Sequence, residues 1–191
     1  MLSASDCGEE IVKYIAATSL MLLVVAPLLM GQGMQSSAPT ANPIVSTVRQ
    51  MEGRYARNLT GAADEMPAEK YGYRPTPEQM SFAHLIMHTA EANNSLCAAV
   101  AGEKPRELKL SESDSKETLS KALKDSFSYC EQVLAKADDS TLGQTVTLYE
   151  GQTGTRGAAL IRLAAGWADH YSAAAMYLRL NNLLPPSAQK H

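Results

Sequence analysis

Apolar residues recur along most of this chain at the three- and four-residue spacing of amphipathic helices. The spacing predicts helices over residues 43–63, 77–101, 115–137 and about 154–180. No strand-like alternation separates them, so we expect an all-α four-helix bundle over residues 43–187 and a short tail at 188–191. The first three apolar stripes are Ile44, Val48, Met51, Tyr55 and Leu59; Phe82, Leu85, His88, Ala92, Leu96 and Val100; and Leu119, Leu123, Phe127, Cys130 and Leu134.

Capping and helix-breaking residues mark the ends of these segments. Asn42 followed by Pro43 is typical of a helix start, and either Thr76 or Ser81 can cap the second helix. Gly102 ends the second helix. The last helix stops at the Asn pair 181–182, shortly before a Pro pair at 185–186. Residues 138–155 are expected to form a loop with short turns.

An uncharged apolar run over residues 15–30 precedes the first predicted helix and follows Lys13. The run is shorter than the ~20 residues that usually span a bilayer, and it matches the apolar core of a signal peptide. We therefore expect a signal peptide over 1–33, a linker over 34–42, and a periplasmic or secreted protein. The alternative is a membrane anchor formed by 15–30, and in both cases only this segment meets a membrane.

The first eleven residues carry three acidic side chains, which is unusual for a signal peptide. We therefore hypothesise that translation starts at Val12 through a non-standard start codon. A peptide containing Cys7 in the unprocessed protein would contradict this hypothesis.

Charge and cysteine content narrow the function classes further. The formal net charge of −3 provides no basic surface for nucleic acid, and no nucleic-acid-binding motif is present. Beyond the expected signal peptide, the cysteines are Cys97 and Cys130. They either form a disulfide in an oxidising compartment or act as two small buried apolar residues.

The histidines are the main candidates for chemistry. His84 and His88 lie four residues apart on the second predicted helix and so share a face, and His170 lies on the last helix near Trp167. Three imidazoles from facing helices can hold a divalent metal and leave one position open. A histidine in an apolar stripe can also be a hydrogen-bonded core residue, and this alternative stays open.

Carboxylates and tyrosines lie next to these histidines in the sequence. Glu91 and Asp169 are candidates for a ligand, a partner of a ligand or a general base, or they belong to a solvated face. Tyr171 and Tyr177 are expected to pack inside the bundle. Catalytic nucleophile motifs and phosphate-binding glycine loops are absent from the sequence, so no catalytic residue is assigned.

Several segments, in order, resemble the DinB-like family, also described as the DinB/YfiT-like superfamily of metalloenzymes. The resemblance spans about residues 43–187. It includes the family's connector, its second and third helices and the end of its last helix, in the segments 66–71, 74–78, 85–88, 126–130, 169–171, 177–180 and 184–187, with Cys97 and the Gly-Glu pair at 102–103.

The resemblance implies a four-helix bundle, often a homodimer, that binds zinc, nickel or a similar divalent metal through three histidines. His88 and His170 match two of these ligands, whereas the third position falls on Gly166. His84 could replace the missing ligand if His170 lies between His84 and His88 in the folded bundle. With His84 as this replacement, the predicted metal ligands are His84, His88 and His170.

Two functions follow as expectations. The first is an exported metal-dependent enzyme with transferase or hydrolase-like activity on an unknown small molecule. The alternative is a non-catalytic bundle that binds a ligand or partner and has lost the metal site.

Overall fold

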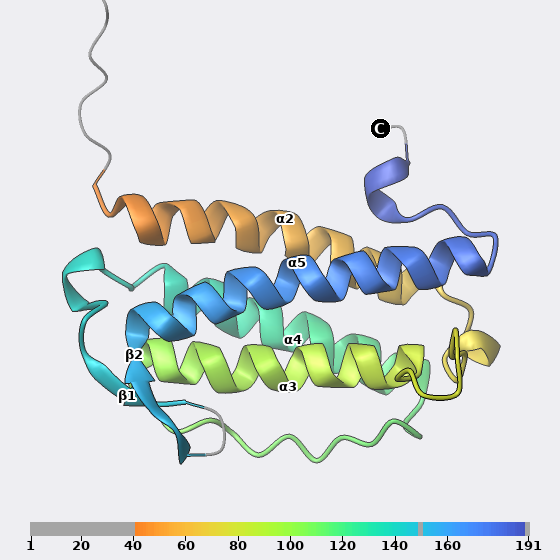
Figure 1. Ribbon diagram of the computed structural model, residues 1–191, viewed down its shortest axis with the longest axis horizontal. Helices are drawn as coiled ribbons and strands as arrows, with labels where there is room; N and C mark the ends of the chain where they lie inside the picture. The colour runs from red at the N-terminus through yellow and green to blue at the C-terminus, as the bar shows by residue number, and fades with distance from the viewer. Residues whose placement is uncertain (1–40, 149–150, 190–191) are drawn as a thin grey trace, which may run out of the picture. The chain divides into compact units, whose positions relative to one another are not determined.

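The computed structural model describes residues 41–148 and 151–189. This part contains four long helices, α2 (Pro43–Glu65), α3 (Phe82–Ala101), α4 (Lys116–Leu134) and α5 (Arg156–Leu180), with a small hairpin, β1 (Thr145–Thr147) and β2 (Thr153–Thr155), before α5. Single 3-10 turns cover Ala68–Lys70, Asp139–Thr141 and Pro186–Ala188. Figure 1 shows the helices side by side, which confirms the predicted four-helix fold.

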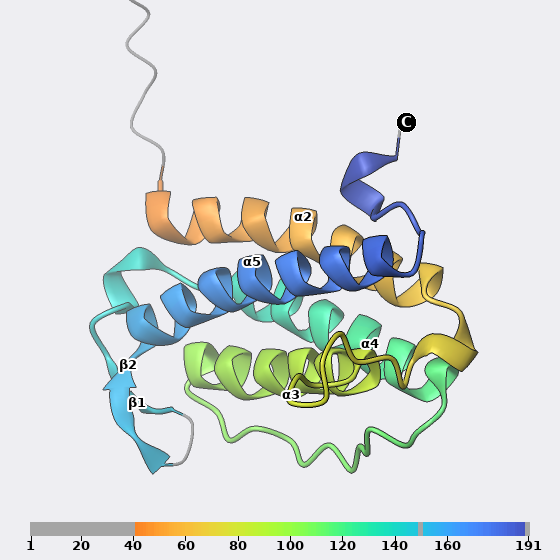
Figure 2. The ribbon, with the colours of Figure 1, turned by 45° about the vertical axis from the view of Figure 1, so that its right-hand side comes forward.

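Each helix packs against two others, in the cyclic order α2, α5, α3 and α4. Helices α3 and α4 run parallel, because Asn93 bonds to Ser126 and Cys97 joins Cys130, both across 33 residues of sequence. Successive parallel helices need a connection that returns along the bundle, and the segment 102–115 runs back in this way (Figures 1 and 2). Its residues are mostly exposed.

The core lies where the four apolar faces meet. Its largest fully buried side chains include Trp167, Phe82 and Met66 together with nine aliphatic residues of the helices: Leu59, Leu85, Ile86, Leu119, Leu123, Leu134, Leu160, Leu163 and Leu178. Most of the predicted stripe positions are buried. Ile44 is an exception at 52% exposed, and Val45 takes its place in the core.

The start of α2 is capped from a distant part of the chain. Asn42 does not cap the helix through its side chain. The backbone N–H groups of Ile44 and Val45 instead donate to the Asp139 carboxylate, each at 2.9 Å, and the Asp139 N–H donates to Asn42 Oδ1. This reciprocal capping satisfies backbone donors that the first turn of a helix leaves free.

Three predictions about the elements are corrected, two of them helix boundaries. Helix α3 begins at Phe82, because the Ser81 hydroxyl accepts a hydrogen bond from the His84 N–H and caps the helix there. Helix α4 ends at Leu134 rather than 137. The expected loop 138–155 contains the antiparallel hairpin, whose strands are rich in β-branched threonine.

The predicted signal peptide, the proposed start at Val12, the anchor alternative and nearly all of the linker lie outside the described residues. Among the residues that are described, none of the helices is both long enough and apolar enough to cross a membrane.

Candidate functional site

The histidine region lies between α3 and α5, which run antiparallel. The Trp167 indole N–H donates to Asn93 Oδ1 at 2.6 Å, and the Tyr177 hydroxyl donates to the Met80 carbonyl at 2.8 Å. These two contacts fix the register between the helices. They place His170 level with His88, and the two ring centres are 5.0 Å apart with the rings nearly perpendicular.

Burial keeps His170 neutral. Its side chain is partly buried, and this burial lowers the pKa below its usual 6.5; nearby His88 lowers it further, whereas Asp169 acts in the opposite direction. A neutral imidazole has one ring nitrogen with a free lone pair, which can bind a metal ion or accept a proton. At neutral pH, one ring nitrogen of His170 can therefore bind a metal ion or accept a proton.

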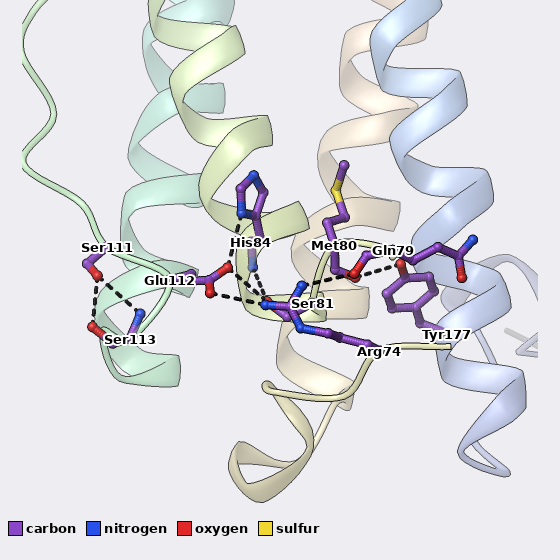
Figure 3. Close-up of polar contacts among 9 residues, drawn as sticks. All are labelled: Arg74, Gln79, Met80, Ser81, His84, Ser111, Glu112, Ser113 and Tyr177. Carbon is purple, nitrogen blue, oxygen red and sulfur yellow. Dashed lines mark hydrogen bonds and ion pairs between the residues drawn. The ribbon is translucent and has the colours of Figure 1, made fainter. Parts of the chain in front are cut away.

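His84 belongs to a different set of contacts, shown in Figure 3. Its Nδ1 donates to Glu112 Oε2 at 3.1 Å, and the other oxygen of Glu112 forms an ion pair with Arg74, also at 3.1 Å. The Ser81 hydroxyl donates to the same Glu112 oxygen as His84. The hydrogen bond from His84 is the largest of several causes that lower the pKa of Glu112. These contacts fasten the connector 102–115 to the start of α3.

Ring spacing tests whether the three histidines fit one metal ion. A zinc–nitrogen bond of ~2.0–2.1 Å places the ring centre roughly 3.2 Å from the ion, so two ligands at a tetrahedral angle have ring centres about 5 Å apart. His88 and His170 match this spacing. The ring centres of His84 and His88 are 6.5 Å apart, which exceeds what two rings on one ion can span.

The third ligand position of the resemblance, Gly166, lies one turn before His170 on α5. A Cβ added at Gly166 would meet only the His170 ring, at an ordinary contact distance of 3.7 Å. A Cβ is therefore tolerated at this position, but glycine supplies no donor atom there. Across the described ranges 41–148 and 151–189, no three or more His, Cys, Asp or Glu side chains group in a way that could hold a metal ion. The described residues therefore do not bring three ligand side chains together around His88 and His170, and the predicted metal set His84, His88 and His170 stays a prediction.

The remaining sequence candidates have structural contacts. Tyr171 and Tyr177 are both buried, as expected, and the Tyr171 hydroxyl donates to Ser187 Oγ at 2.6 Å, which holds the C-terminal turn against the bundle. Glu91 is half-buried and Asp169 is exposed. Neither carboxylate takes part in the hydrogen bonds found within the described ranges.

A buried polar network and a disulfide lie roughly one and a half and two and a half turns, respectively, from His88 along α3. Asn93 is 1% exposed and links three helices, because its amide accepts from Trp167 and donates to Ser126. Cys97 and Cys130 form a disulfide, with Cα atoms 5.4 Å apart. The sequence left the cysteine pairing open and gave no signal for the role of Asn93.

Comparison with known proteins agrees with this architecture. Bundles of the same fold occur in a DinB-like protein from Bacillus cereus (TM-score 0.61, 13% identity, 74% of this chain and 95% of that chain) and in one from Bacillus subtilis (TM-score 0.60, 16% identity, 76% and 99%). A mycothiol-dependent maleylpyruvate isomerase is also similar in fold (TM-score 0.55, 13% identity), and the matched region covers 67% of this chain and 59% of the isomerase.

No curated protein sequence matches this chain. The family model of the DinB superfamily matches residues 53–172, which is more than half of the 191 residues. The resemblance seen in the sequence is confirmed, and the chain belongs to the DinB superfamily.

Proposed function

We propose that this protein is a binding protein of the DinB superfamily that acts outside the cytoplasm and does not use a three-histidine metal centre. The observation that carries the proposal is Gly166, which supplies no ligand where the family pattern has a histidine. His84 does not compensate, because its ring centre lies 6.5 Å from that of His88.

The disulfide supports a location outside the cytoplasm. Both sulfur atoms come from fully buried cysteines on neighbouring helices. Disulfides persist in oxidising compartments and are rare in the reducing cytoplasm. Together with the apolar run at 15–30, the disulfide favours export to the periplasm or secretion. Mass spectrometry of the native protein, with and without reduction, tests the disulfide directly, and two free thiols in the isolated protein would contradict the proposed location.

A metal-dependent transferase or hydrolase-like enzyme is the second candidate. The observation that favours it is the His88–His170 pair, whose 5.0 Å spacing suits two ligands of one ion. Zinc or nickel at such a centre would lower the pKa of a bound water or thiol. Two imidazoles leave half of a tetrahedral shell to other donors, so this candidate requires a ligand that the described residues do not place there.

Metal analysis of untagged protein, purified without chelators, separates the two candidates. We expect zinc and nickel contents well below one ion per chain. A full equivalent of metal in the wild type would overturn the proposal. The His84→Ala variant then decides the ligand set, because loss of the metal in this variant would assign His84 as the third ligand, whereas full retention would exclude it.

We also propose that the protein forms a homodimer, as its family resemblance implies. The outer face of α5 supports this, since Ile161, Met176 and Leu180 are 67%, 43% and 53% exposed and lie near one stripe of the helix. Analytical ultracentrifugation tests it, and a monomer at all accessible concentrations would contradict it.

A further inference from the structure

A cavity of about 620 Å³ lies at the opposite end of α5 from the C-terminal turn, where α3 ends beside the hairpin. Figure 1 shows β1 and β2 next to the end of α3 and the start of α5. Since Arg156 and His170 are 14 residues apart on one helix, the cavity is roughly 21 Å from the histidine pair along the axis. It is therefore separate from the site described above.

The lining combines an apolar body with a few polar groups, which is typical of small-molecule sites, and the volume lies within their usual range of ~300–1,000 Å³. Apolar walls come from α3, the segment after it and β1. Ser95, Thr145 and Thr147 also line the cavity. Arg156 and Lys104 supply positive charge.

The Arg156 guanidinium is the most informative group in this lining. Its Nε atom is buried without a hydrogen-bond partner, and it is the only side-chain nitrogen or oxygen atom in that condition within the described ranges. No ion pair within 41–148 and 151–189 involves Arg156. Burying a donor of a charged group without an acceptor is costly, so such a group calls for an explanation.

The fold holds this guanidinium in place from one side. Gly102 ends α3 with a positive φ of 76°, and a Cβ added there would lie 2.7 Å from Arg156 Nη2. The guanidinium thus occupies the space that a side chain at Gly102 would fill. The C-terminal end of α3 favours a nearby cation, whereas the first turn of α5, where Arg156 lies, disfavours one.

The acidic residue of the lining is engaged elsewhere. Glu103 borders the cavity, but its Oε2 accepts a hydrogen bond from the Tyr129 hydroxyl at 3.4 Å. Arg156 and Lys104 together outweigh its charge, so the described lining is net positive.

We propose that this cavity binds a small organic anion, with its carboxylate or phosphate group on Arg156 and its apolar part against Ala99, Val146 and Leu148. Arginine presents donors in a planar fork that matches both anionic groups. This inference deepens the proposed function, on which it rests only in treating the bundle as a binding protein. Metal analysis tests the proposed function and anion titration tests the cavity, so a negative result in one measurement does not decide the other proposal.

The test is a titration of the full-length protein with benzoate, phenyl phosphate and the neutral control benzamide, followed by amide NMR. We expect the amide signals of Gly102, Val146 and Thr147 to shift with one or both anions, and benzamide to bind at least tenfold more weakly. The stronger of the two anions identifies the headgroup as carboxylate or phosphate. Equal binding of benzamide, or shifts confined to the histidine region, would overturn the proposal.

Two arginine variants of equal charge change make the test specific. Arg156→Gln should weaken anion binding at least about tenfold, the effect of losing a hydrogen bond to a charged group. Arg162→Gln, on an exposed position of the same helix, should leave it within twofold. Equal effects of the two variants would overturn the proposal.

If Arg156→Gln does not fold, the variants Arg156→Lys and Arg162→Lys serve instead, because both keep the positive charge. A lysine cannot form two parallel hydrogen bonds to one anionic group. We therefore expect Arg156→Lys alone to weaken binding several-fold. Unchanged binding in both lysine variants would contradict the assignment of Arg156.

Discussion

Two glycines lie next to the two polar groups discussed above, Gly102 beside Arg156 at the end of α3 and Gly166 beside His170 within α5. At Gly102 the backbone has a positive φ, and an added Cβ would lie 2.7 Å from the Arg156 guanidinium, which would have to shift. At Gly166 the backbone is helical, and an added Cβ would make one ordinary contact. The positive φ therefore favours a glycine at 102, whereas neither the backbone nor the packing requires one at 166.

The two glycines therefore have different roles: Gly102 serves the backbone conformation at the end of α3, whereas Gly166 affects the histidine site. Glycine in a helix interior lowers stability by roughly 0.5–1 kcal/mol relative to alanine. Gly166 brings that cost without a compensating close approach, and it lies where the family pattern has a metal ligand. Its effect on the protein is therefore chemical: the histidine pair is left without its third partner.

The largest expected effect comes from restoring that partner. Gly166→His should create a site with His88 and His170, because a Cβ at this position makes only an ordinary contact and three imidazoles suffice for zinc. We expect zinc to bind at least a thousandfold more tightly than to the wild type. With zinc at 1,000 times its Kd, the free energy of unfolding should rise by about 4 kcal/mol.

Competition with a chelating dye measures this affinity, and thermal unfolding with and without zinc measures the stability. Gly166→Ala is the matched control and should bind zinc no better than the wild type. Equal affinity of Gly166→His and Gly166→Ala would show that the pair is not poised to receive a third ligand.

Glu52 should give the largest pH-dependent change in stability, because its pKa is strongly raised. This glutamate on α2 is 7% exposed, and burial, with a smaller contribution from Glu131, raises its pKa from 4.5 to about 7. Between these values the folded chain keeps a proton that the unfolded chain releases, so stability falls as the pH rises from 4.5 through 7.

Glu52→Gln should therefore raise the free energy of unfolding at pH 8 by up to about 3 kcal/mol, and change it little at pH 4.5. Urea unfolding at both pH values measures the difference. Glu131→Gln, which removes only the neighbouring charge, should give a smaller gain at pH 8. An equal gain from Glu52→Gln at the two pH values would contradict the raised pKa.

Alanine substitutions should affect the two glycines in opposite directions. Gly102→Ala should lower the free energy of unfolding by about 1–2 kcal/mol, because an L-residue is strained at positive φ. Gly166→Ala should raise it by roughly 0.5–1 kcal/mol, through the better helix propensity of alanine. Chemical unfolding of both variants checks the signs, and a loss of stability in Gly166→Ala would mean that the helix requires this glycine.

The smallest effect is a change in the titration of His170. Its lowered pKa means that the unfolded chain takes up a proton first as the pH falls below 6.5, so this residue reduces stability on acidification. NMR titration of the ring should give a pKa below 6.5. Gly166→Ala adds a methyl group beside the ring and should lower the pKa further; an increase would contradict desolvation as the main cause.

The sequence predicted much of the fold and part of the site for physical reasons. Three- and four-residue periodicity predicts helices because it reflects burial of one helix face. His88 and His170 could be paired through the family pattern. His84 could not be placed, because its partner Glu112 lies 28 residues away in a connector without periodicity. The capping of α2 by Asp139 could not be predicted for the same reason, because Asp139 lies 95 and 94 residues after its donors Ile44 and Val45.

The sequence by itself determined the helical class, the family and the absence of a ligand side chain at residue 166. These properties depend on local composition, on spacing and on residue identity. Only the tertiary structure decided that His170 lies level with His88, that Cys97 and Cys130 are joined, and that Arg156 lies against Gly102 in the wall of a cavity. Each of these depends on the register between helices, which contacts between distant residues fix.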